Sequence, residues 1–125
     1  MRSAVLTSLL LIANASIGAD VSGHWEITAR LGEIPITVNC VLEQSAEALS
    51  GTCTPVMQDP QTSALTGTVD GTSIQWSYDV VFNGNPGHVA YDGEIESDTR
   101  ITGTLDLSGT LTQFTAALRP SEQAL

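Results

Sequence analysis

The side chains that could act as general bases or metal ligands are few and scattered. The two histidines, His24 and His88, lie on predicted strands where the alternation of apolar and polar residues turns both side chains outward. A shared metal ion or a nucleophile–base pair needs side chains that converge, and this alternation supplies none. No G-x-S-x-G or H-E-x-x-H motif occurs. We therefore predict solvated histidines, no catalytic residue, no cofactor and a protein that is not an enzyme.

Carboxylates are more concentrated than histidines. Asp92, Glu94, Glu96 and Asp98 are alternate residues of one predicted strand, and Ca²⁺ prefers oxygen ligands of this kind. Neighbours on one face of a strand lie about 7 Å apart, which is too far for one ion unless the strand bends. Outward strand residues also do not supply the cleft with two carboxyl groups about 5 Å apart that a retaining glycosidase needs. The pattern therefore predicts a solvated acidic face and no metal site.

Aromatic residues form the most promising cluster for binding. Their positions predict one shared interior face, made by Trp76, Tyr78, Phe82, Tyr91 and Phe114. Aromatic side chains dominate core energetics, so one interpretation is a packed core. The other is the lining of an apolar pocket at a barrel mouth, where a ligand would partner the polar tips of Trp and Tyr. Trp76, Tyr78 and Tyr91 are the best candidates for such a wall, because their strands are predicted to be adjacent.

The two cysteines predict a disulfide. Cys40 and Cys53 are an even pair in a chain with an export signal, described below. A two-residue turn at Ala46-Glu47 places them directly opposite each other on adjacent strands, as a cross-strand bridge requires. The bridge should contribute about 3 kcal/mol. A free thiol pair or half of a metal site is the alternative, but the spacing is too long for C-x-x-C chemistry.

Period-two alternation runs through the chain and no long helical period occurs, so these side chains must be positioned by strands. Turn residues divide the pattern into eight strands, near Ser22–Leu31, Ile34–Glu43, Ala48–Pro55, Ala64–Val69, Ser73–Phe82, His88–Glu96, Arg100–Leu107 and Thr110–Arg119. Composition predicts loops at Val56–Ser63 and Asn83–Gly87, and Asp70-Gly71 predicts a tight hairpin. Inward positions include Ile34 and Phe82.

Short turns force neighbouring strands to pair antiparallel. A flat eight-stranded meander would leave two exposed edges, and pairing the last strand with the first removes both. The fold class we predict is all-β, an eight-stranded antiparallel up-and-down barrel; a β-sandwich is the alternative.

A glycine motif recurs in three strands, as Leu49–Cys53, Leu65–Val69 and Ile101–Leu105. Each copy has an inward glycine that follows Ser or Thr. Inward glycines permit the sharp coiling of a small barrel. The alternative is that they open room for a ligand.

The start of the chain predicts export. A short positive segment, Met1–Ser3, precedes an apolar run from Ala4 to Ile12 and then small residues, the order of a secretory signal peptide. The run is too short to span a membrane. We predict a signal peptide over residues 1–19, cleaved after a residue from Ala15 to Ala19, a barrel domain over 20–120 and a frayed tail over 121–125. The protein would be periplasmic or secreted, with no membrane span.

The charge balance excludes polyanionic partners. Loss of Arg2 with the signal changes the formal charge from −10 to −11, and the rest of the chain holds no Lys and only Arg30, Arg100 and Arg119 as strong cations. Nucleic acid and anionic membrane surfaces are recognised by clustered Lys and Arg. We therefore predict no nucleic-acid partner.

The two ends of the predicted barrel resemble a known pattern. Gly23-His24-Trp25 opens the first strand and Arg119 closes the last. This resembles the calycin pattern of lipocalins, avidins and small bacterial metalloprotease inhibitors, and the whole chain looks like short exported bacterial barrel domains. The resemblance implies that Trp25 plugs one barrel end with Arg119 stacked across it, a cation–π contact. Counterparts of the biotin-holding residues of avidins are absent.

Two functions follow from these observations. The first is a noncatalytic exported protein that holds a small apolar or amphipathic ligand in the barrel. The alternative is a module that binds a secreted protein, such as a periplasmic protease inhibitor. The inhibitor resemblance implies a free N-terminal segment that enters the protease cleft, and cleavage after Ala15 would leave Ser16–Ser22 for that role.

Overall fold

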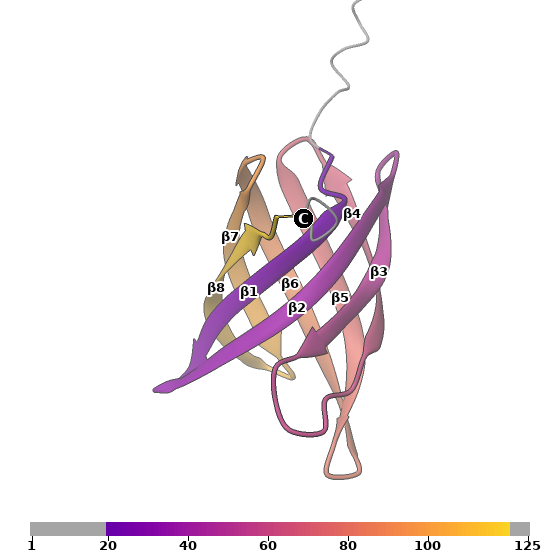
Figure 1. Ribbon diagram of the computed structural model, residues 1–125. Helices are drawn as coiled ribbons and strands as arrows, with labels where there is room; N and C mark the ends of the chain where they lie inside the picture. Colours follow the sequence, from indigo (N-terminus) through magenta and orange to yellow (C-terminus); the bar gives the residue numbers. More distant parts are fainter. Residues whose placement is uncertain (1–19, 121–125) are drawn as a thin grey trace, which may run out of the picture.

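The chain folds into one closed barrel of eight strands. The structure is a computed structural model that describes residues 20–120, so the predicted signal peptide and tail lie outside the described residues. The strands, in chain order, are β1 (Gly23–Leu31), β2 (Ile34–Ser45), β3 (Ala48–Pro55), β4 (Ser63–Asp70), β5 (Ser73–Phe82), β6 (Asn85–Ser97), β7 (Arg100–Leu107) and β8 (Thr110–Leu118). Each strand pairs with the next in the sequence (Figure 1). No helix in residues 20–120 has the length and apolar character needed to cross a membrane.

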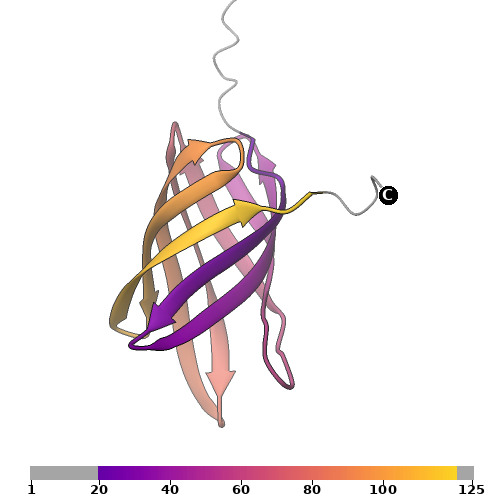
Figure 2. The ribbon, with the colours of Figure 1, turned by 60° about the vertical axis from the view of Figure 1, so that its left-hand side comes forward.

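Pairing between the first and last strands closes the barrel. β1 and β8 run antiparallel, with a register from Trp25 opposite Leu118 to Ala29 opposite Phe114. Figure 2 shows β8 lying beside β1 along this seam. The predicted up-and-down barrel is thereby confirmed and the β-sandwich alternative is wrong, because a sandwich would leave these two strands apart.

Most connections are two-residue turns, and one predicted loop is shorter than expected. Composition predicts a loop over Asn83–Gly87, but the turn is only Asn83-Gly84, and β6 already begins at Asn85. Asn83 and Gly84 both have positive φ, 52° and 81°. Two such residues build the turn whose twist matches paired strands, so the ladder continues through Pro86 opposite Val81.

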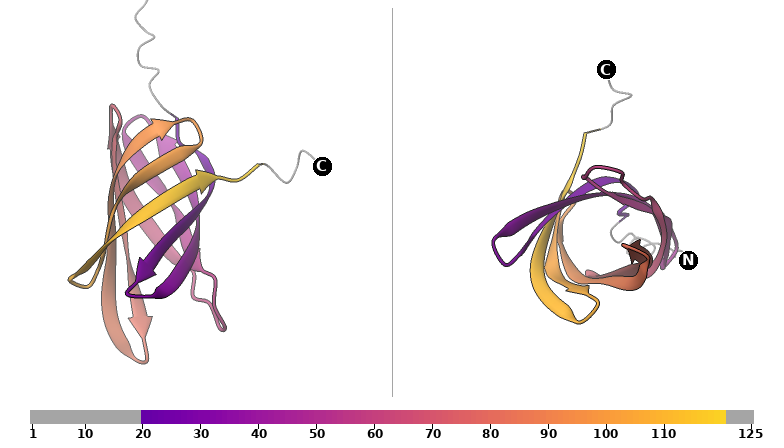
Figure 3. Two further views of the ribbon diagram at one scale, coloured as in Figure 1. Left: turned by 90° about the vertical axis from the view of Figure 1, so that its left-hand side faces the viewer. Right: turned by 90° about the horizontal axis from the view of Figure 1, so that it is seen from below.

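The barrel has two unlike ends, the closed end and the open end. The closed end carries the start of β1 and the turns Ala46-Glu47, Gly71-Thr72 and Asp98-Thr99. The open end carries the turns Gly32-Glu33, Asn83-Gly84 and Ser108-Gly109 and the longer β3–β4 loop, residues 56–62. The closed end is uppermost in Figure 1, and the right-hand view of Figure 3 looks along the barrel from the open end.

The alternation of apolar and polar residues correctly predicts the buried face of each strand, except where a strand extends past the rim of the open end. Ile34 is 67% exposed and Phe82 is 50% exposed, although both are predicted to point inward. Figure 1 shows the β5–β6 hairpin extending below the rest of the open end and the β1–β2 hairpin extending sideways from the barrel. Beyond the rim no opposite wall exists, so inward residues there meet solvent.

The recurrent glycines are required by strand packing. A Cβ atom built on Gly51 would collide with the backbone carbonyl oxygen of Val41, and one on Gly67 with that of Gln75. Gly103 lies opposite Gly93, and a Cβ atom built on Gly103 would collide with the backbone carbonyl oxygen of Asp92. This supports the closure interpretation of the motif. The alternative is wrong, because neighbouring backbone occupies the space beside these three glycines.

The predicted disulfide is present. Cys40 and Cys53 lie directly opposite each other on β2 and β3, with their Cα atoms 4.0 Å apart, and both are fully buried. A disulfide is typical of proteins in oxidising compartments, so it is consistent with export.

Candidate functional site

An apolar pocket opens at the open end of the barrel. Its volume is about 530 Å³, within the range of small-molecule sites. Apolar and aromatic side chains make most of the wall, and they are Leu31, Pro35, Ile36, Val38, Pro55, Val56, Met57, Tyr78, Val80, Val81, Phe82, Val89, Tyr91, Leu105 and Leu107. The polar lining residues are Thr37, Asp59, Gln61 and Ser108. No Lys, Arg or His belongs to the lining.

A packed aromatic cluster fills the barrel beneath this pocket. Trp76 stacks on Tyr91 with ring centroids 4.6 Å apart. Phe114 packs edge-on against both rings, 5.9 Å from Trp76 and 5.2 Å from Tyr91. The hollow is therefore confined to one end and the middle of the barrel is solid.

The five predicted binding residues divide between these two regions. Tyr78, Tyr91 and Phe82 line the pocket, whereas Trp76 and Phe114 do not and instead support Tyr91 from below. Tyr78 and Tyr91 also belong to the buried core, and ligand binding by any of the five residues stays a prediction. Sequence reasoning missed the apolar β3–β4 loop residues Val56 and Met57, and the signal for them was two apolar residues in an otherwise polar loop.

The deepest polar groups of the pocket are two tyrosine hydroxyls. The hydroxyl oxygens of Tyr78 and Tyr91 lie 2.7 Å apart, a hydrogen bond within the buried interior. Burial raises the pKa of both phenols, because the charged phenolate would lose its hydration, and each neighbouring hydroxyl modifies that effect. Both groups therefore stay neutral at physiological pH, and one of the two hydroxyls donates to the other.

The two tryptophans differ in how their indole N–H is partnered. The Nε1–H of Trp25 donates to the backbone carbonyl oxygen of Val21 at 2.9 Å. The Nε1 atom of Trp76 is buried and has no hydrogen-bond partner within residues 20–120. An unpartnered buried donor costs stability, so the core of the barrel is less fully satisfied around Trp76 than around Trp25.

The predicted plug is half correct. Trp25 is 1% exposed and fills the closed end. However, β8 places Leu118 opposite Trp25 and facing in, so the next residue, Arg119, faces out. Its guanidinium lies 3.9 Å from Glu26 on the outer surface. The predicted stacking of Arg119 on Trp25 is therefore wrong, because strand alternation separates the two side chains across the wall.

The chain segment before β1 is anchored across the closed end. Val21 is buried, and its backbone N–H donates to the side-chain carbonyl of Gln44. The hydroxyl of Ser22 accepts a hydrogen bond from the backbone N–H of Gln44. Because Val21 and Ser22 are held in place, the predicted free segment Ser16–Ser22 cannot extend that far; residues 16–19 lie outside the described part of the chain.

The histidines are not brought together. His24 lies on β1 and His88 on β6, with β8 and β7 between these strands in the barrel, and both are exposed. His88 forms a surface pair with Asp79, with Nδ1 2.8 Å from the carboxylate oxygen. No group of three His, Cys, Asp or Glu side chains within residues 20–120 is arranged to hold a metal ion.

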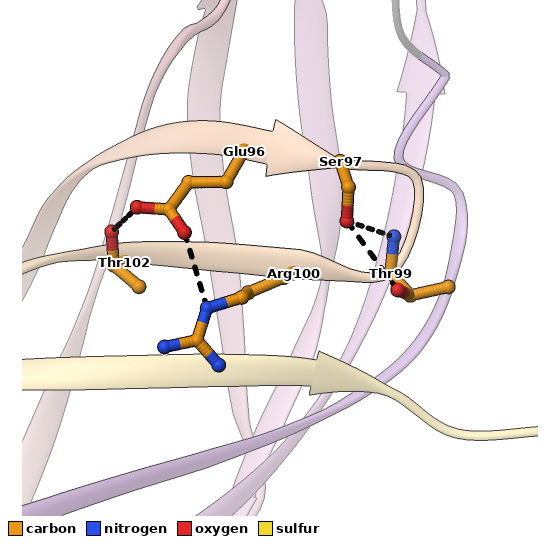
Figure 4. Close-up of polar contacts among 5 residues, drawn as sticks. All are labelled: Glu96, Ser97, Thr99, Arg100 and Thr102. Atoms are coloured by element: carbon orange, nitrogen blue, oxygen red, sulfur yellow. Dashed lines mark hydrogen bonds and ion pairs between the residues drawn. The ribbon is translucent and has the colours of Figure 1, made fainter.

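The acidic strand uses its carboxylates in local hydrogen bonds. Glu96 accepts from the hydroxyl of Thr102 at 2.7 Å and from Nε of Arg100 at 3.1 Å (Figure 4). These contacts, led by Thr102, lower the pKa of the Glu96 carboxyl. Glu94 accepts from the hydroxyls of Thr72 and Ser73. Glu96 thus joins β6 to β7, and Glu94 joins β6 to the start of β5.

Comparisons with known proteins show the fold alone. No family model and no curated protein matches the sequence. A solved structure described as a redesigned β-barrel is similar to this chain with a TM-score of 0.59 and 14% sequence identity, covering 81% of this chain and 92% of that one. The likeness extends over nearly the whole barrel and shows the barrel fold.

Proposed function

We propose that this protein is an exported, noncatalytic binding protein that holds a small apolar or amphipathic molecule at the open end of its barrel. The observation that carries the proposal is the apolar pocket of about 530 Å³ with a rigid aromatic floor. A concave apolar site with a few polar groups is the usual form of a small-molecule site.

The rest of the molecule supports a scaffold role. The closed end is filled by Trp25, the middle by the aromatic cluster, and β2 is joined to β3 by the disulfide. A rigid wall loses little conformational entropy when a ligand binds, and this favours affinity. The disulfide and the predicted signal peptide together favour a periplasmic or secreted location.

Nile red, a neutral apolar dye, tests the proposal. We expect its fluorescence to rise and shift to shorter wavelength when the protein is added, because the dye leaves water for an apolar site. Leu107→Trp should weaken this binding at least tenfold, since Leu107 lines the pocket and the larger ring fills it.

Leu111→Trp is the matched control. Leu111 lies on the same β7–β8 hairpin, is exposed and does not line the pocket. It should leave dye binding unchanged. Equal loss in both variants, or no binding by the parent protein, would contradict the proposal.

A second function, a protein-binding module, is favoured by the rim. Six large apolar side chains at the open end are exposed, and they are Ile34, Val56, Met57, Val81, Phe82 and Leu111. Contiguous exposed apolar surface is typical of interaction sites. A periplasmic protease inhibitor would use such a rim, and inhibition of a panel of secreted proteases by the purified protein, lost in a Phe82→Ser variant, is the result that this function requires.

A further inference from the structure

The two tyrosine hydroxyls at the inner part of the pocket have one hydrogen-bond donor to spare. Each phenol carries one O–H, and the single contact between them uses one of the two protons. Neither hydroxyl has another hydrogen-bond partner among residues 20–120. One buried donor is thus left facing the pocket that both residues line.

Position indicates which hydroxyl keeps the spare proton. Tyr91 is the lining residue of β6 that lies furthest from the turn Asn83-Gly84, and it is packed between Trp76 and Phe114. Tyr78 is nearer the mouth and slightly less buried. Either hydroxyl can donate in this hydrogen bond, and we assign the donor to Tyr91 because it is the more deeply buried of the two and has no acceptor other than Tyr78 among residues 20–120.

The pocket lining holds no positive charge that would stabilise an anion. It includes Asp59. Arg30 lies on β1 near the open end, and its guanidinium donates to the backbone carbonyl oxygen of Glu33. Arg100 and Arg119 lie beside Glu96 and Glu26 on the outer surface. A carboxylate drawn into this site would exchange its hydration for a single hydrogen bond from a neutral hydroxyl, and it would also meet a chain of strongly negative net charge.

Two of the four other polar lining residues, Gln61 and Ser108, already accept hydrogen bonds near the rim. The side-chain carbonyl of Gln61 accepts from the backbone N–H of Val81. The hydroxyl of Ser108 accepts from the backbone N–H of His88. The inner part of the pocket therefore presents apolar surface and one directed O–H.

We propose that the ligand is an uncharged molecule with an apolar body and a hydrogen-bond acceptor at its inner end, such as a ketone, ester or amide carbonyl, and that the Tyr78 hydroxyl donates to this acceptor. Tyr91 is a positioning residue, which donates to Tyr78 and so orients its proton toward the ligand. This inference rests on the proposed function, since it specifies the ligand of the same pocket. The raised pKa of both phenols supports it, because a donor that stays protonated serves at any physiological pH.

Three probes of equal chain length test the inference: dodecane, methyl decyl ketone and dodecanoate, each added in competition with Nile red. The ketone should bind about three- to tenfold more tightly than dodecane, the usual gain from one net hydrogen bond. Dodecanoate at pH 8 should bind more weakly than the ketone. In Tyr78→Phe the preference for the ketone over dodecane should disappear.

Infrared spectroscopy supplies a readout that does not depend on affinity. The carbonyl stretch of the bound ketone should lie at lower wavenumber than that of the ketone in alkane, and Tyr78→Phe should return it to the alkane value. Tyr91→Phe removes the other hydroxyl of the pair, which lies deeper in the pocket. It should keep both the lowered wavenumber and part of the ketone preference, because the Tyr78 donor is still present.

The outcomes separate the two proposals. If none of the three probes binds, the proposed function fails and the inference fails with it. If dodecane binds as well as the ketone, or dodecanoate binds best, the pocket is a binding site but the assignment of its donor is overturned. An infrared shift that survives Tyr78→Phe and is lost in Tyr91→Phe would likewise overturn the assigned direction of the hydrogen bond.

Discussion

The two ends of this barrel are built from the same strands and meet solvent in opposite ways. At the closed end, Val21 crosses the opening and accepts a hydrogen bond from Trp25, which is 1% exposed. At the open end no segment of residues 20–120 crosses, and apolar side chains such as Phe82 and Met57 surround a pocket. The alternation of apolar and polar residues along a strand thus decides which side chains face the interior. Whether those side chains form packed core or line a pocket depends on whether a segment covers that end of the barrel.

A second contrast lies inside the barrel, between the two tryptophans. Trp25 has its indole N–H partnered by a backbone carbonyl, and Trp76 does not. Trp76 lies directly beneath the pocket through its contact with Tyr91. The unsatisfied polar group and the spare tyrosine donor thus both belong to the half of the interior next to the proposed site, which agrees with the tendency of functional regions to be less than optimally stable.

The largest effect should come from truncating one aromatic residue at each end. Trp25→Ala should lower the free energy of unfolding by about 3–5 kcal/mol, because it empties a fully enclosed part of the core. Phe82→Ala should cost about 1 kcal/mol or less, because half of that ring is already in water. Urea unfolding followed by circular dichroism measures both. Equal losses would erase the distinction between the ends.

A smaller effect should separate the two tryptophans when only the indole is changed. Both Trp→Phe substitutions remove buried area, but Trp25→Phe also deprives the Val21 carbonyl of its donor, whereas Trp76→Phe removes a donor that has no partner. Trp25→Phe should therefore be the more destabilising of the two by about 1–3 kcal/mol. The same unfolding measurement gives this difference, and a reversed order would show that Trp76 is satisfied in solution.

The smallest effect concerns pH at the open end. Tyr78 and Tyr91 are the two tyrosines of the chain, so tyrosinate absorbance reports this pair alone. Burial raises the pKa of both hydroxyls in the folded protein. Their stabilising effect is therefore complete below the unfolded value, about 10, and is lost as the pH rises above it.

Spectroscopic titration provides the check. The folded protein should show no tyrosinate signal where the urea-unfolded protein already titrates, and the free energy of unfolding should decline above pH 10. If both tyrosines ionise near pH 10 in the folded protein, the pair is open to water and the solid floor of the pocket is disproved.

Much of the fold could be predicted because its signals are local. The period of two identified the strands, and the residues around Ala46-Glu47 gave the register that pairs Cys40 with Cys53. The site was harder. Five aromatic residues were recognisable as one interior face, but the division of that face into floor, wall and exposed rim could not be read from periodicity, because Phe82 and Trp76 occupy equivalent positions in the alternation.

The strands, their inward faces, the glycines where neighbouring strands pack closely and the disulfide could all be predicted from the sequence. Each of these depends on residues that are adjacent in the chain or lie across a short turn. The sequence predicted that the last strand closes on the first but left a sandwich as the alternative, and the structure resolved that choice. The structure alone showed that Val21 covers one end, that Arg119 points away from Trp25 and that a pocket lies at the other end. These features join residues that are far apart in the sequence. They depend on the strand tilt and the stagger between strands in the closed barrel, which no local sequence pattern encodes.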